Sequence, residues 1–442
     1  MQKYKHSVLL DISKCKGCTA CLKRCPTEAI RIRDGHAQIN SSRCIDCGEC
    51  IRVCPYKAKK ADHDPLDSMK EFKKTVALPA PALYGQFDNM TNIDYIVDGL
   101  YKMGFDHVFE VACAAEMVTA YTRMYLDRPD VKKPVISSAC PVMMRLIGMN
   151  FPYLADQVMP ILPPIEVAAE ISRAKMLEMY PDLTSEDIGI FFISPCPAKV
   201  SYVKNGFAGK RNNIDRVVSV RDVYFKLIDV MKNGNEPERG SDAGMIGIGW
   251  ATTGGESSAV FNERYLASDG IENCMRVLEQ IENEDFTDLD FIELNACSGG
   301  CVGGAMTVAN PYIAQARLQS LKRYLPVSPN RPSHTEIPEK YFTDEDVVYN
   351  RAEPLSTNRA EARRMMAEME QIRAELPGID CGSCGAPNCM AFAEDIVKGE
   401  TNADECTIIM REMFHDYLEK YKAGYVGEKL RPFLKKTDDD RS

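Results

Sequence analysis

The chain has 442 residues, a formal net charge of -10 at pH 7 and 45% hydrophobic residues. This length predicts two to four domains with an ample core. The negative charge argues against a surface for nucleic acid or for an anionic membrane. No apolar run approaches about 18 residues, so no transmembrane helix is expected. The polar start at Met1 lacks an apolar signal core, which predicts a cytoplasmic protein.

Cysteine is the most unusual feature of the composition, with 18 residues. In a reducing compartment, clustered cysteines bind metal more often than they form disulfides. Eight cysteines precede residue 55, six are scattered through the middle and four follow residue 380. This placement predicts metal chemistry along the whole chain.

Two runs of the form Cys-x2-Cys-x2-Cys-x3-Cys-Pro occupy residues 15–26 and 44–55. Their spacing resembles that of bacterial ferredoxins with two [4Fe–4S] clusters, in which the fourth cysteine of each run ligates the other cluster. One cluster is therefore expected at Cys15, Cys18, Cys21 and Cys54, and the other at Cys44, Cys47, Cys50 and Cys25. Zinc is the alternative, since paired CxxC motifs also bind it. Short strands are expected at 29–32 and 37–39. Residues 1–64 are thus predicted to form an α+β ferredoxin-like domain that transfers single electrons.

Strands and helices alternate from about residue 73 onwards. Residues 75–78 and 80–83 suggest a buried strand leaving a turn, and further strands are expected at 106–110, 134–136, 188–193 and 291–294, with helices at 92–103, 165–179 and 220–231. This alternation predicts an α/β fold with parallel sheets covered by helices and ligands at the carboxyl ends of the strands. Cys140, Cys196 and Cys297 each follow an expected strand, as that rule requires.

The stretch 295–305 places Cys297 and Cys301 among glycines that let the backbone approach a bulky ligand. Four residues make one helical turn, so both sulfurs are expected on the same side. Cys140 and Cys196 lie upstream, and each is followed by proline. Together these stretches resemble the three signature segments of the [FeFe]-hydrogenase catalytic domain, over roughly residues 73–325. The resemblance implies a two-lobed domain.

The resemblance also implies a specific cofactor. This is the H-cluster, a [4Fe–4S] cube bridged by one cysteine to a two-iron unit with CO, cyanide and a dithiolate amine. By motif matching, Cys140, Cys196, Cys297 and Cys301 hold the cube, and Cys301 also bridges to the two-iron unit. Lys199 matches the lysine that pairs with one cyanide; the alternative is an ordinary solvated lysine. Pro81 and Ala82 match the segment near the other cyanide, and Gly254–Gly255 matches a Gly-Gly turn.

Several positions depart from the catalytic pattern of this family. Ala139 replaces a second cysteine that passes protons to the bridging amine. Ser194 replaces a methionine that packs on the cluster, and Asn295 replaces its counterpart; both are expected to retune hydrogen bonding there. The remaining departures are Met143 for a tryptophan, Tyr202 for a glutamate, and Tyr121, Thr122 and Tyr125 after Ala115–Glu116. The chain keeps all the cysteine ligands but lacks the residues of the fast proton route. This combination resembles the sensory or regulatory branch of the family.

The C-terminal part is predicted to contain a linker at 326–356 and a helix at 358–376 whose Met365, Met366 and Met369 form a core stripe. Cys381-x2-Cys384-x4-Cys389-x16-Cys406 resembles a small domain that holds one [4Fe–4S] cluster, with zinc as the alternative. The expected plan is therefore 1–64, 73–325, a linker and helix over 326–376, an iron–sulfur domain over 377–410, and a helix and charged tail over 411–442. The tail after residue 435 is predicted to be disordered.

Three functions fit these patterns. The first is a slow hydrogenase-type oxidoreductase that interconverts H2 and protons and acts as an H2 sensor. It would contain four [4Fe–4S] clusters and exchange electrons with a ferredoxin or a signalling protein. A homodimer is one option for its assembly. The second is a non-catalytic iron–sulfur scaffold or electron carrier without the two-iron unit. The third is a subunit of a larger electron-transfer complex. Lys199 and the Cys297/Cys301 pair favour the first. Cys113 and Cys274 are expected to be free buried thiols.

Overall fold

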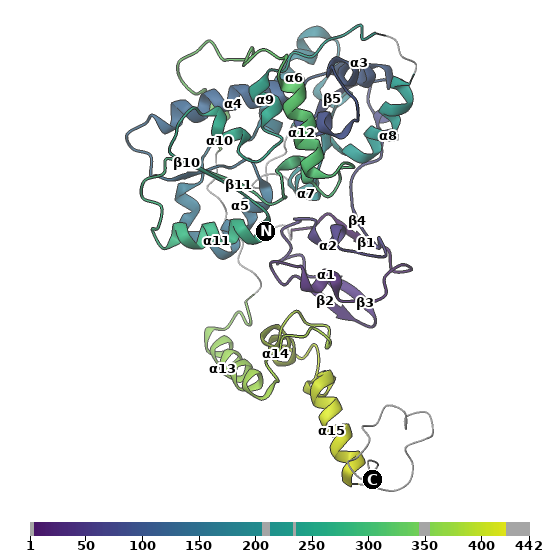
Figure 1. Cartoon of the computed structure of the whole chain (residues 1–442), viewed down its shortest axis with the longest axis vertical. Coiled ribbons are helices and arrows are strands. Elements are labelled where there is room, and N and C mark those ends of the chain that lie inside the picture. Colours follow the sequence, from purple (N-terminus) through teal and green to yellow (C-terminus); the bar gives the residue numbers. More distant parts are fainter. Residues whose placement is uncertain (1–3, 206–212, 233–235, 344–353, 421–442) are drawn as a thin grey trace, which may run out of the picture. The chain divides into compact units, whose positions relative to one another are not determined.

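The computed structural model describes residues 4–205, 213–232, 236–343 and 354–420 (Figure 1). For residues 418–420 it describes the backbone alone. Two compact units follow each other along the chain, Met1–Pro354 and Leu355–Ser442, and each is described by itself. The expected disorder after residue 435 lies outside the described residues. No helix in the described ranges is both long and apolar enough to cross a membrane.

The first unit begins with two small antiparallel ribbons. Strand β1 (Val8–Leu10) pairs with β4 (Lys59–Ala61), and β2 (Ile30–Arg33) pairs with β3 (His36–Ile39). Two one-turn helices, α1 (Ala20–Lys23) and α2 (Glu49–Arg52), each carry a cysteine inward. Val8, Leu22, Ile30 and Ala37 fill the small core between them. The two expected strands are confirmed within one residue at each end.

A parallel sheet of four strands follows. Its order is β6 (His107–Val108), β5 (Lys74–Pro79), β8 (Ile188–Ser194) and β9 (Arg216–Ser219). All seven residues of β8 are buried, as expected for a central strand covered on both faces. Helices α4 (Val111–Leu126) and α6 (Pro164–Met179) pack on the face of Ile190 and Phe192. Helices α3 (Asp94–Lys102) and α8 (Val220–Met231) pack on the face of Phe191 and Ile193.

The second parallel sheet has three strands in the order β10 (Tyr265–Asp269), β11 (Phe291–Asn295) and β7 (Val135–Ile136). Helices α5 (Pro141–Asn150) and α11 (Ile271–Glu282) pack against Ile136, Ile292 and Leu294. The predicted α/β class with parallel sheets, preceded by a ferredoxin-like region, is therefore confirmed.

The remaining elements of this unit are all helical. They are η1 (Leu66–Glu71), η2 (Pro81–Gln86), η3 (Pro152–Gln157), η4 (Ser185–Asp187), α7 (Pro197–Asn205), α9 (Met245–Gly249), α10 (Gly255–Ala259), η5 (Cys301–Gly303), α12 (Pro311–Lys322) and η6 (Glu339–Tyr341). The part of the expected linker before residue 344 does more than connect, because Ile337 and Tyr341 are buried in the core beside α4 and α6.

The second unit contains α13 (Arg359–Glu375), α14 (Cys389–Val397), η7 (Ala403–Glu405) and α15 (Thr407–Lys420). Its core joins Leu376, Ala386, Phe392 and Cys406, and Met369 packs against it. The predicted helix over 358–376 is confirmed, with Asn358 as its N-cap. The predicted methionine stripe is wrong at Met366, which is 52% exposed, because only one narrow face of α13 touches the small core.

Candidate functional site

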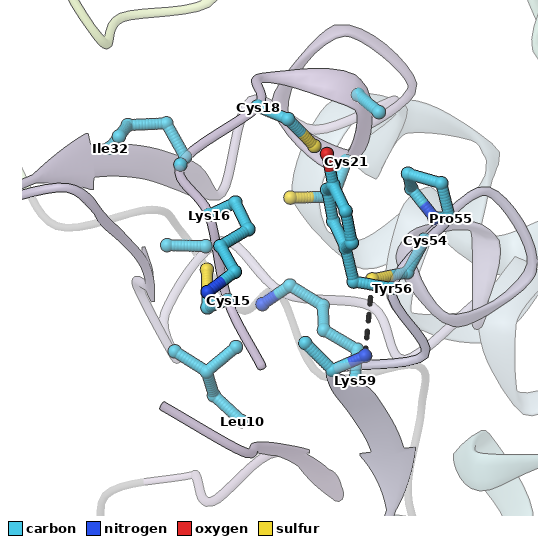
Figure 2. A pocket seen from close by; sticks show the side chains of 14 residues that line it. Leu10, Cys15, Lys16, Cys18, Cys21, Ile32, Cys54, Pro55, Tyr56 and Lys59 are labelled. Atoms are coloured by element: carbon cyan, nitrogen blue, oxygen red, sulfur yellow. Dashed lines mark hydrogen bonds between the residues drawn. The ribbon is translucent and has the colours of Figure 1, made fainter. Parts of the chain in front are cut away.

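The eight N-terminal cysteines line two separate pockets. Cys15, Cys18, Cys21 and Cys54 line the first cysteine pocket (Figure 2), and Cys25, Cys44, Cys47 and Cys50 line the second. The fourth cysteine of each run thus stands with the other run, the exchange that the ferredoxin spacing leads one to expect. In both pockets the fourth sulfur accepts a backbone N–H at 3.2 Å, from Ala29 to Cys25 and from Ala58 to Cys54.

The chemistry of these sulfurs fits an iron–sulfur cube. Burial raises the pKa of the Cys50 thiol to about 12 and raises the pKa of Cys44 and Cys47 well above the usual value. Buried thiols of this kind become thiolates only when a cation replaces the lost water. Within the described ranges, no three His, Cys, Asp or Glu side chains are placed to hold a single metal ion.

The central cysteine site consists of Cys140, Cys196, Cys297 and Cys301. The first three follow β7, β8 and β11, so both sheets contribute, and Cys301 begins η5. Burial and the other thiolates of the site raise the pKa of Cys297 to about 12 and that of Cys301 to about 11, although the charges of Arg52 and Lys199 act in the opposite direction. Four buried or half-buried cysteines gathered in this way are suited to a shared metal cluster.

The connection between Cys297 and Cys301 differs from the expected helical turn. Gly299 and Gly300 have φ angles of +80° and +86°, so the chain makes a left-handed loop there before η5. A Cβ atom on Gly304 would lie 2.2 Å from the carbonyl oxygen of Pro195. This close approach holds the loop of Cys301 against the segment of Cys196. The two sulfurs are therefore brought together by a glycine loop and not by helical periodicity.

Lys199 lies in α7 and is only 9% exposed, so it is not an ordinary solvated lysine. Its Nζ atom is 3.9 Å from the Cys301 sulfur. Burial lowers the pKa of Lys199, but the charges of Cys301 and the other three cysteines outweigh that effect and raise it. The lysine is therefore a cation held beside the central cysteine site, where it can meet an anionic ligand.

Pro81 and Ala82 begin the buried helix η2, and Ala82 belongs to the same apolar group as Cys301. Gln86 at the other end of η2 ties it to the loop after Cys301. Its Oε1 atom accepts the backbone N–H groups of Val308 at 2.9 Å and Ala309 at 2.8 Å. The expected second anion-facing segment is thus fixed next to the central cysteine site.

The side chains of Ser194 and Asn295 form hydrogen bonds with neighbouring residues. The Ser194 hydroxyl donates to the Cys196 carbonyl at 3.0 Å and accepts its N–H at 3.3 Å. The Asn295 amide donates to Glu293 Oε1 at 2.6 Å. Both residues therefore orient their neighbours.

The polar residues of α4 and α7 have structural partners. The Tyr121 hydroxyl lies 3.1 Å from His334 Nε2, and Tyr202 faces Glu166. Glu116 accepts the backbone N–H groups of Gly244 and Asn330 at 2.6 and 2.9 Å. It therefore fastens two loops to the helix.

A buried carboxyl pair stands behind Ala139, and sequence reasoning missed it. Glu256 and Glu293 are 4% and 3% exposed. Glu293 accepts four hydrogen bonds, from Gly254, Asn295 and both the N–H and hydroxyl of Ser257. Glu256 accepts one, from the Ser137 hydroxyl at 2.7 Å, and its Oε1 atom has no partner in the described part of the chain.

The surroundings decide which carboxyl keeps a proton. Burial raises the pKa of both carboxyls, but the hydrogen bonds that Glu293 accepts counteract this at Glu293, whereas the neighbouring charge of Glu293 raises the pKa of Glu256 further. The Ser137 hydroxyl that bonds Glu256 also accepts the N–H of Ala139 at 3.2 Å. The structure therefore places a carboxyl of raised pKa one hydroxyl away from residue 139. The position of Glu256 after Gly254–Gly255 was the only available signal.

Arg52 joins the second cysteine pocket to the central cysteine site, and sequence reasoning missed it as well. Its Nη2 atom donates to the Cys297 sulfur at 3.0 Å and to the Gly303 carbonyl at 2.8 Å, while Nη1 pairs with Glu49. At Gly48 a Cβ atom would lie 2.6 Å from the side chain of Ala305. Cys47 and Cys196 belong to one apolar group. The two sites are thus in direct packing contact, as short-range electron transfer requires.

Cys113 and Cys274 are buried free thiols, and Cys274 lies in the same apolar group as Cys196. Burial raises the pKa of both thiols, that of Cys274 to about 12. The Cys274 thiol donates to the Asn295 carbonyl at 3.4 Å.

In the second unit, Cys381, Cys384, Cys389 and Cys406 line one pocket together with Phe392. The sequence motif of the C-terminal part therefore also brings its four cysteines to one place.

Three family models match the chain. The iron-only hydrogenase large subunit, C-terminal domain, matches residues 73–268 and 251–305, which together make up more than half of the chain. A 4Fe-4S dicluster domain matches residues 7–55, and a putative Fe-S cluster domain matches residues 376–408. Iron–sulfur cofactors are therefore supported in all three regions.

Individual relatives match smaller parts. The NADP-reducing hydrogenase subunit HndD of Solidesulfovibrio fructosivorans is 22% identical over 262 residues, covering 46% of this chain and 44% of that protein. An uncharacterised protein of Methanocaldococcus jannaschii is 35% identical over 57 residues, covering 13% of this chain and 25% of that protein. The chain thus spans less than half the length of these curated relatives.

Solved structures of [FeFe]-hydrogenases are also similar. One has 17% sequence identity and a TM-score of 0.48, covering 65% of this chain and 97% of the other. A variant of the Chlamydomonas reinhardtii enzyme has 18% identity and a TM-score of 0.44, covering 61% and 90%. With more than half of its residues matched by one family model, the chain belongs to the iron-only hydrogenase large-subunit family.

Proposed function

We propose that this protein is a slow [FeFe]-hydrogenase that senses H2. It would oxidise H2 or reduce protons at the central cysteine site and exchange electrons through three accessory [4Fe–4S] clusters. The observation that carries the proposal is the combination of a complete set of four cysteines, two buried and two half-buried, with the buried cation Lys199, 3.9 Å from Cys301. The Lys199 ammonium is placed to meet an anionic ligand beside Cys301, and the infrared test below separates a cyanide ligand from compensation by the cube alone.

The cluster ligands in this proposal are the residues of the central cysteine site. Cys140, Cys196, Cys297 and Cys301 would hold a cube, Cys301 would bridge it to a two-iron unit, and Lys199 with the Pro81–Ala82 segment would bind the cyanide ligands. The two-iron unit supplies the site at which H2 is split or formed. Around it, Lys199 contributes positive charge, Ala82 and its apolar neighbours exclude water, and the Glu256–Ser137 pair holds a proton near the site.

In this proposal, proton transfer to the central cysteine site limits the rate of turnover. The methyl group of Ala139 carries no proton, and a positioned donor typically contributes a factor of about 10² to 10⁴ in rate. Tyr121 and Tyr202 offer only hydroxyls of raised pKa. The electron side keeps its clusters, with the second cysteine pocket in contact with the central site through Arg52. Slow turnover suits a sensor, which would pass electrons to a ferredoxin or a signalling protein and would assemble as a homodimer.

Infrared spectroscopy of the full chain reconstituted with the diiron complex tests this function. We expect CO and cyanide bands together with slow H2 turnover that shows a solvent isotope effect. Clusters without such bands would favour the non-catalytic scaffold. Turnover as fast as that of the prototype enzymes would remove the physical basis of the sensor.

The iron content is a separate prediction. Four cubes and one two-iron unit correspond to about 18 iron and 16 inorganic sulfide atoms per chain. Anaerobic iron and sulfide analysis of the reconstituted protein should approach these values before and after gel filtration. About half that iron would contradict the assignment of one cluster to each of the four cysteine groups.

A further inference from the structure

The two halves of the N-terminal domain repeat the same local structure with one difference. After the fourth cysteine, one half reads Cys25-Pro-Thr-Glu-Ala29-Ile30 and the other reads Cys54-Pro-Tyr-Lys-Ala58-Lys59. In each half the alanine N–H donates to the cysteine sulfur at 3.2 Å, and the next residue begins a strand. Ile30 and Lys59 are therefore equivalent positions.

Both equivalent side chains are buried, although one is apolar and the other is cationic. Ile30 is 2% exposed and lines the second cysteine pocket, and Lys59 is 3% exposed and lines the first. Figure 2 shows the Lys59 side chain among Cys15, Cys21 and Cys54. Its Nζ atom has no hydrogen-bond partner within the part of the chain that the structure describes.

A buried ammonium without a partner is costly unless another charge compensates it. In this pocket the compensating charge can come from the cluster itself. A [4Fe–4S] cube with four thiolates is an anion in both of its usual oxidation states, and reduction adds one more negative charge. A fixed cation nearby therefore stabilises the reduced form more than the oxidised form, which raises the reduction potential.

The second cysteine pocket has a different charge balance. Arg52 approaches Cys47, donating to its carbonyl at 3.4 Å, but Glu49 is paired with Arg52 and offsets its charge. Asp46 lies buried beside Cys44 and adds a negative group. Lys59 also acts on Cys50, so its charge reaches the second pocket as well, but its side chain lines the first.

We infer that Lys59 is a redox-tuning residue, which makes the cluster bound by Cys15, Cys18, Cys21 and Cys54 the easier one to reduce of the two N-terminal clusters. An electron that reaches this domain would then reside mainly on the cluster of the first cysteine pocket. The second cysteine pocket is the one that Arg52 links to the central cysteine site. The inference rests on the two-cluster assignment of this domain and not on hydrogen chemistry.

The test is a redox titration of the full chain, reconstituted anaerobically without the two-iron unit and followed by electron paramagnetic resonance. Lys59→Met removes the charge and keeps the length of the side chain. Lys60→Met removes a charge from the exposed next residue of the same strand and is the matched control. Cys18→Ser, which removes one ligand of the first cluster only, identifies the titration step that belongs to that cluster.

At the wild-type midpoint of that step, Lys59→Met should lower the ratio of reduced to oxidised cluster by about tenfold or more, which is 59 mV per tenfold for one electron. Lys60→Met should change it by less than about twofold, because an exposed charge is screened. Lys59→Ile copies the first half of the repeat and should shift the same step downwards. Equal shifts in Lys59→Met and Lys60→Met, or no shift at full iron content, would overturn the inference. Loss of the first cluster in both Lys59 variants would also overturn it, since the lysine would then serve assembly.

Discussion

Replacing Cys301 by serine should remove the CO and cyanide infrared bands from the reconstituted protein while the clusters of the N- and C-terminal cysteine pockets remain. A hard alkoxide is a poor bridge between low-valent iron atoms that a soft thiolate joins well. The substitution also takes away the sulfur that Lys199 faces at 3.9 Å. We therefore expect a loss of about two iron atoms per chain, or about six if the central cube is lost as well.

Cys274→Ser provides the matched control for this experiment. Cys274 is fully buried near the same loop, and its thiol donates to the Asn295 carbonyl at 3.4 Å, a bond that a serine hydroxyl can also make. Cys274 is not one of the four cysteines assigned to the central site, and serine keeps its hydrogen bond, so its variant should keep all iron and both kinds of band. Full CO and cyanide bands in Cys301→Ser would show that another residue bridges the two-iron unit.

The sequence could predict those cysteine segments of the site that directly follow a β-strand. The run Ile188–Ser194 is apolar throughout, and a parallel strand buried on both faces has to be so. Parallel strands end at one edge of their sheet, which accounts for Cys140 and Cys297 after β7 and β11. Cys196 follows β8 of the other sheet, so its place beside them was indicated by the motif resemblance and not by this rule. The exchange of Cys25 and Cys54 between the two N-terminal pockets was predictable for a different reason, because the spacing of the two runs is specific.

Other features depend on contacts between distant segments, which no local pattern encodes. Arg52 reaches Cys297 across 245 positions of the chain. The Glu256–Ser137 contact joins residues 119 positions apart. The loop between Cys297 and Cys301 looked helical by spacing, but positive φ angles at Gly299 and Gly300 give it another path. Met366 matched an apolar stripe in spacing, yet the core of the second unit is too small to cover it.

The burial of Lys59 shows a limit of sequence interpretation. Composition alone would place both Lys199 and Lys59 in solvent. The motif resemblance indicated a role for Lys199 beside the cluster, whereas nothing in the sequence revealed that the segment of Lys59 turns inward at the first cysteine pocket. Glu256 is the acidic counterpart of this pattern. Its carboxyl is hidden beside Glu293, and the like charge nearby helps it to keep a proton.

Replacing Glu256 by glutamine should slow H2 turnover of the fully loaded protein by about 10² to 10⁴, the usual contribution of a positioned proton donor. In our proposal the acid stands one hydroxyl behind Ala139, through Ser137 Oγ at 2.7 Å, and its raised pKa lets it hold a proton at neutral pH. Glutamine has the same size and can still accept the bond from Ser137. The CO and cyanide bands should therefore be unchanged.

The acid itself gives a readout that does not depend on turnover. Because the pKa of Glu256 is raised, its carbonyl stretch as a protonated acid should be visible at pH 7, should shift in D2O, and should be absent from Glu256→Gln. Glu263→Gln, an exposed change in the same lobe, should alter neither the rate nor that band. Ala139→Cys alone should raise the rate modestly, since it restores one donor while Tyr202 and Tyr121 still offer only hydroxyls of raised pKa. An unchanged rate in Glu256→Gln, with the acid band lost and the cofactor bands intact, would mean that protons reach the central cysteine site by a path that avoids Ser137 and Glu256.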